Sequence, residues 1–368
     1  MPALAAGVST DGTIATAAVG CAADTRFRVA SVTKPFTATL ALGLLDLDAT
    51  TGVWPEDVRV RHLLSHTSGY DSECGDLARF GDGDDALGAA VRELPSVRRW
   101  VGADELWSYS NAGYWLAGWL CARAAGSTYE EALADHVLRG LDATSFDAPD
   151  VAGTGLGALD GNAYPRARRP SGGLVSNVGD LLAFAARHLR DRATDVLRVP
   201  VAKPTAGVYG LGFDGERVGG VDVWGHPGSY GGFQSSLLLV PSRRAAFAGL
   251  TNSGAGKQAL REVENAWFEA LLGARRREPA TVELSRAELR AFAGDYANPD
   301  LRVSVAQEDN GLVAHMVAED EGFETTVRAR PIGPCTFEIL EGEFQRDRFD
   351  FPRPGFARFG SRLAERIA

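Results

Sequence analysis

The stretch that most constrains the fold of this chain runs from Ser31 to about Asp46. Pro35 fits only the first turn of a helix, where its missing N–H costs nothing, so we expect a helix that begins at Ser31. Apolar residues continue along one side of it, at Phe36, Leu40, Leu44 and Leu47. A helix that is apolar on nearly all sides is buried. The chain is therefore expected to fold around this helix, with Ser31 at its N-terminus.

Ser31 and Lys34 form a Ser-x-x-Lys pair at the start of the helix. Residues three apart lie on one helix face, and an amine beside a serine can take its proton, which makes the alcohol a nucleophile. The chain has three lysines, Lys34, Lys203 and Lys257, and one of them stands three residues after this serine. Any Ser-x-x-Lys on a solvated helix matches so short a pattern, so its meaning depends on the rest of the chain.

Length and composition predict a two-domain globular protein. The chain has 368 residues, of which 45% are hydrophobic and 23% charged, and its net charge is −10. This balance suits a sizeable core and argues against binding to nucleic acid or an anionic membrane surface. We see no apolar run long enough to cross a bilayer and no basic segment followed by an apolar one, so the default location is cytoplasmic.

The cysteines and histidines do not predict a metal site. The four cysteines include no Cys-x-x-Cys pair, and no His or Cys pair has zinc spacing. His62 and His66 stand four apart on a short predicted helix over 60–69, but no third ligand has a natural spacing, so structural roles are favoured. We expect no metal and no cofactor.

Elsewhere the chain alternates between short strands and helices. Residues 4–8 and 12–20 are typical of a hairpin with Asp11-Gly12 as its turn. Helices are expected over about 112–125, over a segment ending near Arg139 that begins with the capping box Ser127-x-x-Glu130, and over 177–190 with Ser176 as its cap.

The last part of the chain changes to a β pattern. Strands are expected over 233–240 and 245–251, followed by a helix over about 256–272. A charged segment ending in Pro279 is typical of a linker, and the short β segments after it predict a smaller all-β domain. We therefore predict an α+β fold, an antiparallel sheet flanked by helices with an all-helical subdomain, over 1–273, a linker over 274–283 and a small β domain over 284–368.

Two further stretches carry chemistry suited to acyl transfer. Tyr109-Ser110-Asn111 precedes a helix and offers a phenol as proton acceptor and an amide to orient a carbonyl. His226-Pro227-Gly228-Ser229 brings a histidine and a glycine to a strand, where a glycine permits close approach of a substrate. Each stretch alone is also compatible with a half-buried tyrosine or a hydrogen-bonded loop histidine.

Taken in this order and with these separations, the three stretches resemble the serine β-lactamase and penicillin-binding protein superfamily. The resemblance is to the branch that holds class C β-lactamases, related esterases, D-aminopeptidases and D,D-peptidases, and it covers about residues 4–272. Supporting segments lie at 27–36, 62–70, 109–118, 170–182 and 225–253. Residues 291–368, which open with Phe292-Ala293-Gly294-Asp295-Tyr296, resemble the lipocalin-like domain that some members carry.

The resemblance implies a role for each matching position. Ser31 would be the acylated nucleophile, Lys34 and Tyr109 would share the general-base work, and one of them would protonate the leaving group. Asn111 would hold Lys34 and the carbonyl side of the substrate. His226 takes the place of the lysine of Lys-Thr-Gly, and Gly228 matches its glycine. The backbone N–H groups of Ser31 and Ser229 would form the oxyanion hole.

The residue at 226 departs from the β-lactamase pattern. A fixed ammonium suits the carboxylate of a penicillin, whereas a largely neutral imidazole holds it less firmly. The resemblance therefore implies a serine hydrolase of ester or amide bonds in a small molecule or peptide: an esterase, a D-amino-acid amidase or peptidase, or a weak β-lactamase. An acyltransferase or peptide-cyclising thioesterase of the same fold is one alternative, and a penicillin sensor that stays acylated is another.

The sequence assigns neither the general base nor the oligomeric state. The positive end of the helix and burial both favour a neutral Lys34 amine, but the same field would help a Tyr109 phenolate, so the base is not assigned. The family has a helix before its first strand, whereas this chain begins almost at the strand, so we expect part of one wall to be missing or rebuilt. The oligomeric state is not readable.

Overall fold

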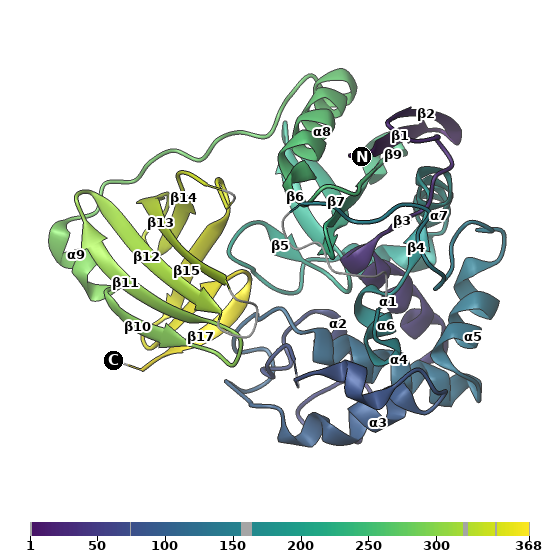
Figure 1. Ribbon diagram of the computed structural model, residues 1–368, viewed down its shortest axis with the longest axis horizontal. Coiled ribbons are helices and arrows are strands. Elements are labelled where there is room, and N and C mark those ends of the chain that lie inside the picture. The colour runs from purple at the N-terminus through teal and green to yellow at the C-terminus, as the bar shows by residue number, and fades with distance from the viewer. Residues whose placement is uncertain (1, 74, 156–163, 319–322, 343, 368) are drawn as a thin grey trace. The chain divides into compact units, whose positions relative to one another are not determined.

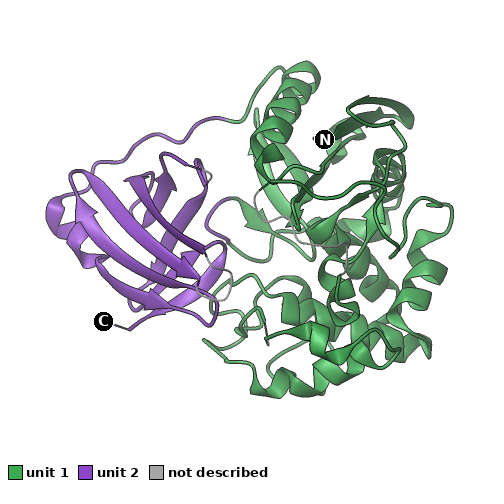
Figure 2. Ribbon diagram, in the orientation of Figure 1, with its two compact units in different colours: residues 1–203, 207–276 green, residues 204–206, 277–368 purple. Residues whose placement is uncertain are grey.

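The computed structural model describes residues 2–73, 75–155, 164–318, 323–342 and 344–367. The chain divides into two compact units (Figure 2), one formed by residues 1–203 and 207–276 and the other by residues 204–206 and 277–368.

A seven-stranded antiparallel sheet forms the centre of the first unit (Figure 1), with the strand order β2-β1-β9-β8-β7-β6-β5. Its strands are β1 (Leu4–Thr10), β2 (Thr13–Val19), β5 (Val208–Tyr209), β6 (Asp214–Val218), β7 (Val221–Tyr230), β8 (Phe233–Val240) and β9 (Ala245–Thr251). The predicted hairpin is confirmed, since β1 pairs with β2 across Asp11-Gly12. Both turn residues have positive φ, 50° and 89°, as the tight hairpin turn requires.

The central strands β8 and β9 are buried on both faces, whereas the edge strand β2 is mostly exposed. Successive side chains of a strand point to opposite faces of the sheet. On β8, Leu237 and Leu239 belong to the large core that includes helix α7 (Val178–Arg190). Leu238 belongs to a separate core with residues of helix α8 (Lys257–Leu272). This position explains why β8 and β9 are almost continuous apolar runs rather than alternating ones.

Helices gather beside the sheet around α1 (Thr33–Leu44), which is confirmed as a central, buried helix. The others are α2 (Val60–Leu64), α3 (Ala86–Glu93), α4 (Asn111–Ala125), α5 (Tyr129–Leu133) and α6 (Arg169–Gly172). A two-stranded ribbon, β3 (Phe27–Arg28) with β4 (Val175–Ser176), leads into α1. The part of the chain predicted as an all-helical subdomain is therefore built around the helix that follows Ser31.

Three local predictions were wrong by one or a few residues. The capping box uses Thr128 and Glu131 rather than the residues one position earlier, because Ser127 and Thr128 are equivalent as caps in a pattern. Asn177, and not Ser176, caps α7. Helix α2 ends at Leu64, well before Gly69. That glycine has φ of 78°, and a Cβ on it would lie 2.1 Å from the Val101 carbonyl oxygen.

The second unit is a closed eight-stranded antiparallel barrel, β10 to β17, with one short helix α9 (Arg286–Ala291). Its strands are β10 (Gly294–Ala297), β11 (Arg302–Glu308), β12 (Gly311–Ala318), β13 (Phe323–Pro331), β14 (Thr336–Ile339), β15 (Arg348–Arg353), β16 (Phe356–Phe359) and β17 (Arg362–Arg366). Aromatic side chains fill its interior, among them Phe337, Phe349, Phe351 and Phe359. The predicted fold class, helices and sheet followed by an all-β domain, is confirmed.

Among the residues that the structure describes, no helix is both long and apolar enough to span a bilayer.

Candidate active site

Ser31 lies in a short 3-10 turn, Ala30–Val32, directly before α1. Ala30 has φ of 45°, a conformation that non-glycine residues seldom adopt. The turn is held from both sides: the Val29 N–H donates to the Leu174 carbonyl at 3.0 Å, and the Ser235 hydroxyl donates to the Val29 carbonyl at 2.7 Å. This bracing keeps the serine half-buried at a sharp turn.

Lys34 is fully buried in the first turn of α1, and its side-chain nitrogen has three oxygen partners. Nζ donates to Ser31 Oγ at 3.2 Å, to Asn111 Oδ1 at 2.8 Å and to the Ser171 carbonyl at 2.8 Å. The same nitrogen lies 4.6 Å from the centre of the Tyr109 ring. The predicted contact between the serine and the lysine is therefore present, and the lysine is fixed in position by two further bonds.

Tyr109 and Asn111 reach Ser31 from the N-terminus of α4. The Tyr109 hydroxyl donates to Ser31 Oγ at 2.8 Å. Ser110 between them caps the helix, since its hydroxyl accepts from the Gly113 N–H and donates to the Asp71 carbonyl. Because the cap sets the direction of the helix start, the residues on its two sides both point to the serine and its lysine.

Gly228 brings β7 against the serine turn. A Cβ placed on it would lie 2.3 Å from the Val29 carbonyl oxygen, 2.3 Å from Ser235 Oγ and 3.1 Å from the backbone nitrogen of Ser31. No side chain fits there, so the glycine is required by close packing of two backbones. Ser229 follows on the exposed side of the strand, and its hydroxyl accepts from Gln234 Nε2 at 2.9 Å.

His226 is buried on β7, and both of its ring nitrogens have protein partners. Nδ1 lies 2.6 Å from the Pro227 carbonyl, to which only its N–H can donate, and Nε2 lies 3.1 Å from the Tyr209 hydroxyl, from which it then accepts. Burial, and after it the charge of Lys34, lowers the pKa of His226 to about 3. The ring is neutral at pH 7, and its nitrogens are occupied by groups of the protein.

His66 lies among the aromatic rings of the site, a position that the sequence did not predict. Its ring centre is 4.3 Å from that of Tyr109 and 4.9 Å from that of Tyr209. Burial, then Lys34, lowers its pKa well below the ordinary value. Nδ1 accepts the Ser110 N–H at 3.0 Å, so the proton is on Nε2. His62 instead bonds Arg59 and Asp104, as its predicted structural role requires.

Two residues at the site carry no sequence motif, Glu73 and Arg168. Glu73 Oε1 accepts from Asn111 Nδ2 at 2.5 Å and from Arg168 at 3.2 Å. Their side chains are 15% and 24% exposed, which places the ion pair at the margin of the buried network. No pattern in the sequence singles out either residue.

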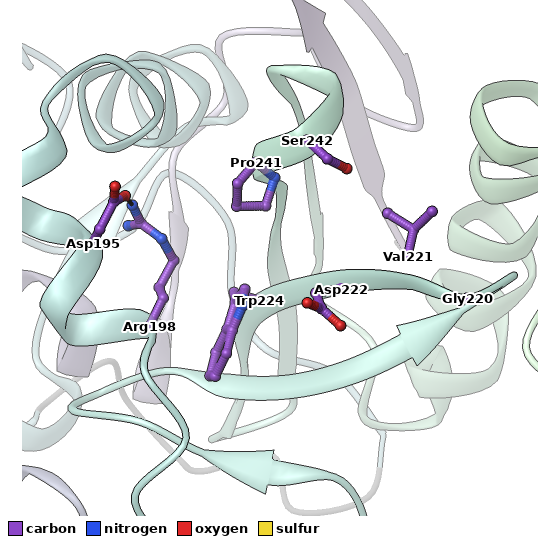
Figure 3. Close-up of a pocket in the computed structure, with 8 residues that line it drawn as sticks. All are labelled: Asp195, Arg198, Gly220, Val221, Asp222, Trp224, Pro241 and Ser242. Carbon is purple, nitrogen blue, oxygen red and sulfur yellow. Dashed lines mark hydrogen bonds and ion pairs between the residues drawn. The ribbon is translucent and has the colours of Figure 1, made fainter.

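A pocket of about 530 Å³ is shown in Figure 3. It is lined by Asp195, Arg198, Gly220, Val221, Asp222, Trp224, Pro241 and Ser242. Arg198 already donates to Asp195 and to the His188 ring. None of the predicted catalytic residues lines it. Within the described residues, no group of three His, Cys, Asp or Glu side chains is arranged to hold a metal ion.

The arrangement around Ser31 has the parts that acyl transfer needs. A hydroxyl lies within hydrogen-bond distance of an amine and a phenol, either of which can take its proton. Gly228 allows β7 to approach the backbone nitrogen of Ser31 closely, as an oxyanion hole made of backbone N–H groups requires. The structure thus brings Ser31, Lys34, Tyr109 and Asn111 within hydrogen-bond distance of one another, and it places Gly228 against the backbone of Ser31 and the His226 ring beside that of Tyr109. Ser229 follows Gly228 in the chain, and its hydroxyl is bonded to Gln234.

The chain is similar to several known proteins over most of its length. Penicillin-binding protein 4 of Amycolatopsis lactamdurans is 29% identical over 320 residues, which cover 73% of this chain and 81% of that protein. The crystal structure of SurE with D-Leu is 25% identical, with a TM-score of 0.77, and covers 99% of this chain and 95% of that one. A D-stereospecific amidohydrolase from Streptomyces sp. is 25% identical, with a TM-score of 0.59, over 73% of this chain and 93% of its own.

The family comparison covers the whole first unit apart from its last residues. The model of the family described as Beta-lactamase matches residues 1–272 of the 368. The resemblance predicted from the three motifs is thereby confirmed: the chain belongs to the beta-lactamase family.

Proposed function

We propose that this protein is a serine hydrolase that cleaves an amide or ester bond through an acyl-enzyme on Ser31. We further propose that the acyl group transferred to Ser31 is that of a D-amino acid. The observation that carries the proposal is the position of Ser31 Oγ, 3.2 Å from Lys34 Nζ and 2.8 Å from the Tyr109 hydroxyl. A serine with two candidate bases at this distance is an activated nucleophile.

In the proposed acylation, Ser31 Oγ attacks the carbonyl carbon of the substrate while its proton passes to Lys34 or Tyr109. The backbone N–H groups of Ser31 and Ser229 stabilise the oxyanion, each such donor contributing about 100-fold or more in rate. The bond to the leaving amine or alcohol then breaks, and the proton returns to that group. Water repeats the sequence on the acyl-serine and releases a carboxylic acid with Ser31 regenerated.

Asn111 and His226 have different parts in this proposal. Asn111 holds Lys34 through its Oδ1. His226, which the sequence assigned to substrate binding, has both nitrogens bonded to protein groups and is neutral. We therefore propose that His226 shapes the surface beside Ser31 and does not bind a substrate carboxylate. A neutral ring at this place also makes efficient penicillin hydrolysis unexpected.

The names of the relatives support the stereochemistry. The amidohydrolase from Streptomyces sp. is D-stereospecific, SurE was crystallised with D-leucine, and a penicillin-binding protein is among the similar chains. We propose a small molecule or peptide with a D-amino-acid acyl group as the substrate class. Residues 1–273 form the catalytic domain in this proposal, 274–283 the linker and 284–368 a lipocalin-like domain, whose closed eight-stranded barrel supports the name.

The test is a matched panel with the wild type and Ser31→Ala. The substrates are the D- and L-forms of leucine and phenylalanine p-nitroanilides, a short-chain activated ester and a chromogenic cephalosporin. We expect the wild type to hydrolyse the D-anilides at least about 10-fold faster than the L-forms. Ser31→Ala should lower kcat/KM by about 1,000-fold or more, because the nucleophile is lost.

Product analysis separates hydrolysis from the alternatives. With an added amine as acceptor, a predominance of amide over acid would assign the protein to acyl transfer instead. A lasting mass adduct on Ser31 after incubation with penicillin, without turnover of any substrate, would assign it to the penicillin sensors. Wild-type rates in the Ser31→Ala protein would remove the serine mechanism altogether.

A further inference from the structure

Asn111 has its side-chain amide between a cation and an anion. Its Oδ1 accepts from Lys34 Nζ at 2.8 Å, and its Nδ2 donates to Glu73 Oε1 at 2.5 Å. An amide has one accepting end and one donating end, and its orientation is set by its partners. A carboxylate only accepts, so Glu73 requires the nitrogen end. The oxygen end is then left for the lysine.

We infer that Glu73 is a positioning residue: its carboxylate, paired with Arg168, orients the Asn111 amide and so holds Lys34 against Ser31. Without the carboxylate the amide can turn over and present its NH₂ group to Lys34, which has only N–H donors to offer when charged. That arrangement loses one of the bonds that fix the lysine. The inference rests on the proposed function only in treating Lys34 as a group that serves Ser31.

The segment that carries Glu73 is fixed against the first turn of α4. The Ser72 hydroxyl accepts from the Asn111 backbone N–H at 3.2 Å, and the Ser72 carbonyl accepts from the Ala112 N–H at 2.8 Å. Two of the N–H groups that a helix leaves unsatisfied at its start are thus used by this loop. The carboxylate is therefore held at a set distance from the amide by the backbone.

Arg168 connects the other end of the network to the same lysine. Its guanidinium donates to Glu73 Oε1 at 3.2 Å, while its carbonyl accepts from the Ser171 hydroxyl at 2.9 Å. The Ser171 carbonyl in turn accepts from Lys34 Nζ at 2.8 Å. Two chains of hydrogen bonds thus hold Lys34, one through Asn111 and Glu73 and the other through Ser171. Arg168 takes part in both chains.

The charge of the pair also acts on Lys34. A carboxylate near an ammonium stabilises its charged form, and a guanidinium destabilises it. The other titratable or charged groups that face this lysine are Tyr109, Tyr114, His66, His226 and Asp214. Removal of Glu73 should therefore lower the Lys34 pKa, and removal of Arg168 should raise it. A merely structural role does not predict two shifts of opposite sign.

The three lysines of the chain permit a direct measurement. Protein labelled with ¹³C at the lysine ε-carbon has three signals, and Lys34→Met identifies the one that belongs to Lys34. We expect Glu73→Gln to move the titration of this signal to lower pH and Arg168→Met to move it to higher pH, each by about half a pH unit or more. This readout needs no turnover.

The second measurement is the rate at which a fluorophosphonate labels Ser31 across pH. Glu73→Ala should slow labelling by about 10- to 100-fold, because the amide is no longer oriented. Glu73→Gln keeps an oxygen that accepts from Asn111 Nδ2, so its rate at the optimal pH should recover to within about 5-fold of wild type. Glu130→Gln is the matched control, since Glu130 also pairs with arginines, Arg166 and Arg169, and is 19% exposed.

Three results would overturn the inference. One is a Lys34 titration that moves in neither variant, or in the same direction in both. Another is a Glu73→Ala protein that labels like the wild type. A third is equal loss in the Ala and Gln variants, accompanied by equal loss of thermal stability, which indicates a structural role. Wild-type protein that hydrolyses nothing would overturn the proposed function instead, since the titration of Lys34 would still be measured.

Discussion

The two sides of Ser31 differ in charge. On the side of α1 and α4, charged and polar groups alternate, from Lys34 through Asn111 and Glu73 to Arg168. On the side of β7, the imidazole of His226 is buried, neutral and bonded to the Tyr209 hydroxyl. The contrast fits the mechanism that we propose, in which Lys34 and its partners serve the proton transfer from Ser31 and His226 forms an uncharged surface opposite them.

The two sides depend on each other. A fully buried amine is costly unless it has hydrogen-bond partners, and Lys34 Nζ lies within hydrogen-bond distance of three oxygens. Burial, and after it the charge of Lys34, lowers the pKa of both His66 and His226. A second fixed cation at position 226 would add like-charge repulsion in a space with little water. Histidine at this position is therefore compatible with the network as built.

The largest expected effect is on the rate of Ser31 acylation, which substitution of Lys34 should lower far more than substitution of His226. Lys34→Ala should lower the labelling rate of Ser31 by about 1,000-fold, within the usual range for loss of a general base. His226→Gln should lower it by less than about 10-fold, because the ring contacts protein groups and Gln can still accept from Tyr209. Fluorophosphonate labelling measures both, and melting curves establish that both variants are folded. Equal losses would remove the proposed division between the two sides.

The difference between the two sides also explains what the sequence could predict. Ser31, Lys34, Tyr109 and Asn111 stand in short motifs whose order and spacing are specific, and the structure places them within hydrogen-bond distance of one another. Glu73 and Arg168 stand 38 and 95 positions from their partners. Neither has a neighbouring residue that marks it. Arginine is common in this chain, so a single one carries no signal.

His226 differs from Glu73 and Arg168, because a motif marks its position but not its hydrogen-bond partners. Its position in a motif indicated substrate binding, and only the fold shows that Pro227 and Tyr209 use both nitrogens. The strands of the sheet were predicted well because β8 and β9 are long apolar runs next to a turn. The predicted helix caps were wrong by one residue where two possible capping residues are adjacent, since both satisfy the same pattern.

A smaller effect concerns stability in acid. The pKa of His226 falls from 6.5 to about 3 on folding, and that of His66 falls as well. Between these pH values the unfolded chain binds a proton that the folded chain excludes, so the free energy of unfolding decreases as the pH falls below 6.5. Each such histidine contributes at most about 1.4 kcal/mol per pH unit.

Urea unfolding of the wild type and of His226→Gln from pH 7 to pH 4 measures this dependence. We expect the free energy of unfolding of the variant to fall less steeply with decreasing pH, although the variant is less stable at pH 7. Parallel curves for the two proteins would mean that folding does not lower the pKa of His226, so that the folded protein would protonate the ring below about pH 6.5. The surface on that side of Ser31 would then carry a charge.

The smallest expected effect concerns the β7 side of Ser31 and an acidic residue there whose pKa is strongly raised, Asp214. Asp214, on β6 beside β7, has a pKa raised from 3.8 to about 7, first by burial and then by the charge of Glu216, against the opposing influence of Lys34. Between these pH values the folded chain keeps a proton that the unfolded chain has released. The free energy of unfolding contributed by this group therefore decreases as the pH rises towards 7. Asp214→Asn removes that loss, so the variant should melt higher than the wild type at pH 8 and show a smaller gain at pH 5. The gain should stay below about 5 °C, since the side chain is only half-buried.

Asp222→Asn is the matched control, because Asp222 is an exposed carboxylate on the adjacent strand, in an ion pair with Arg217. A gain in the control as large as that of Asp214→Asn would assign the effect to surface charge. An Asp214→Asn protein that melts lower at pH 8 would mean that the folded protein stabilises the ionised carboxylate, which contradicts a raised pKa of Asp214.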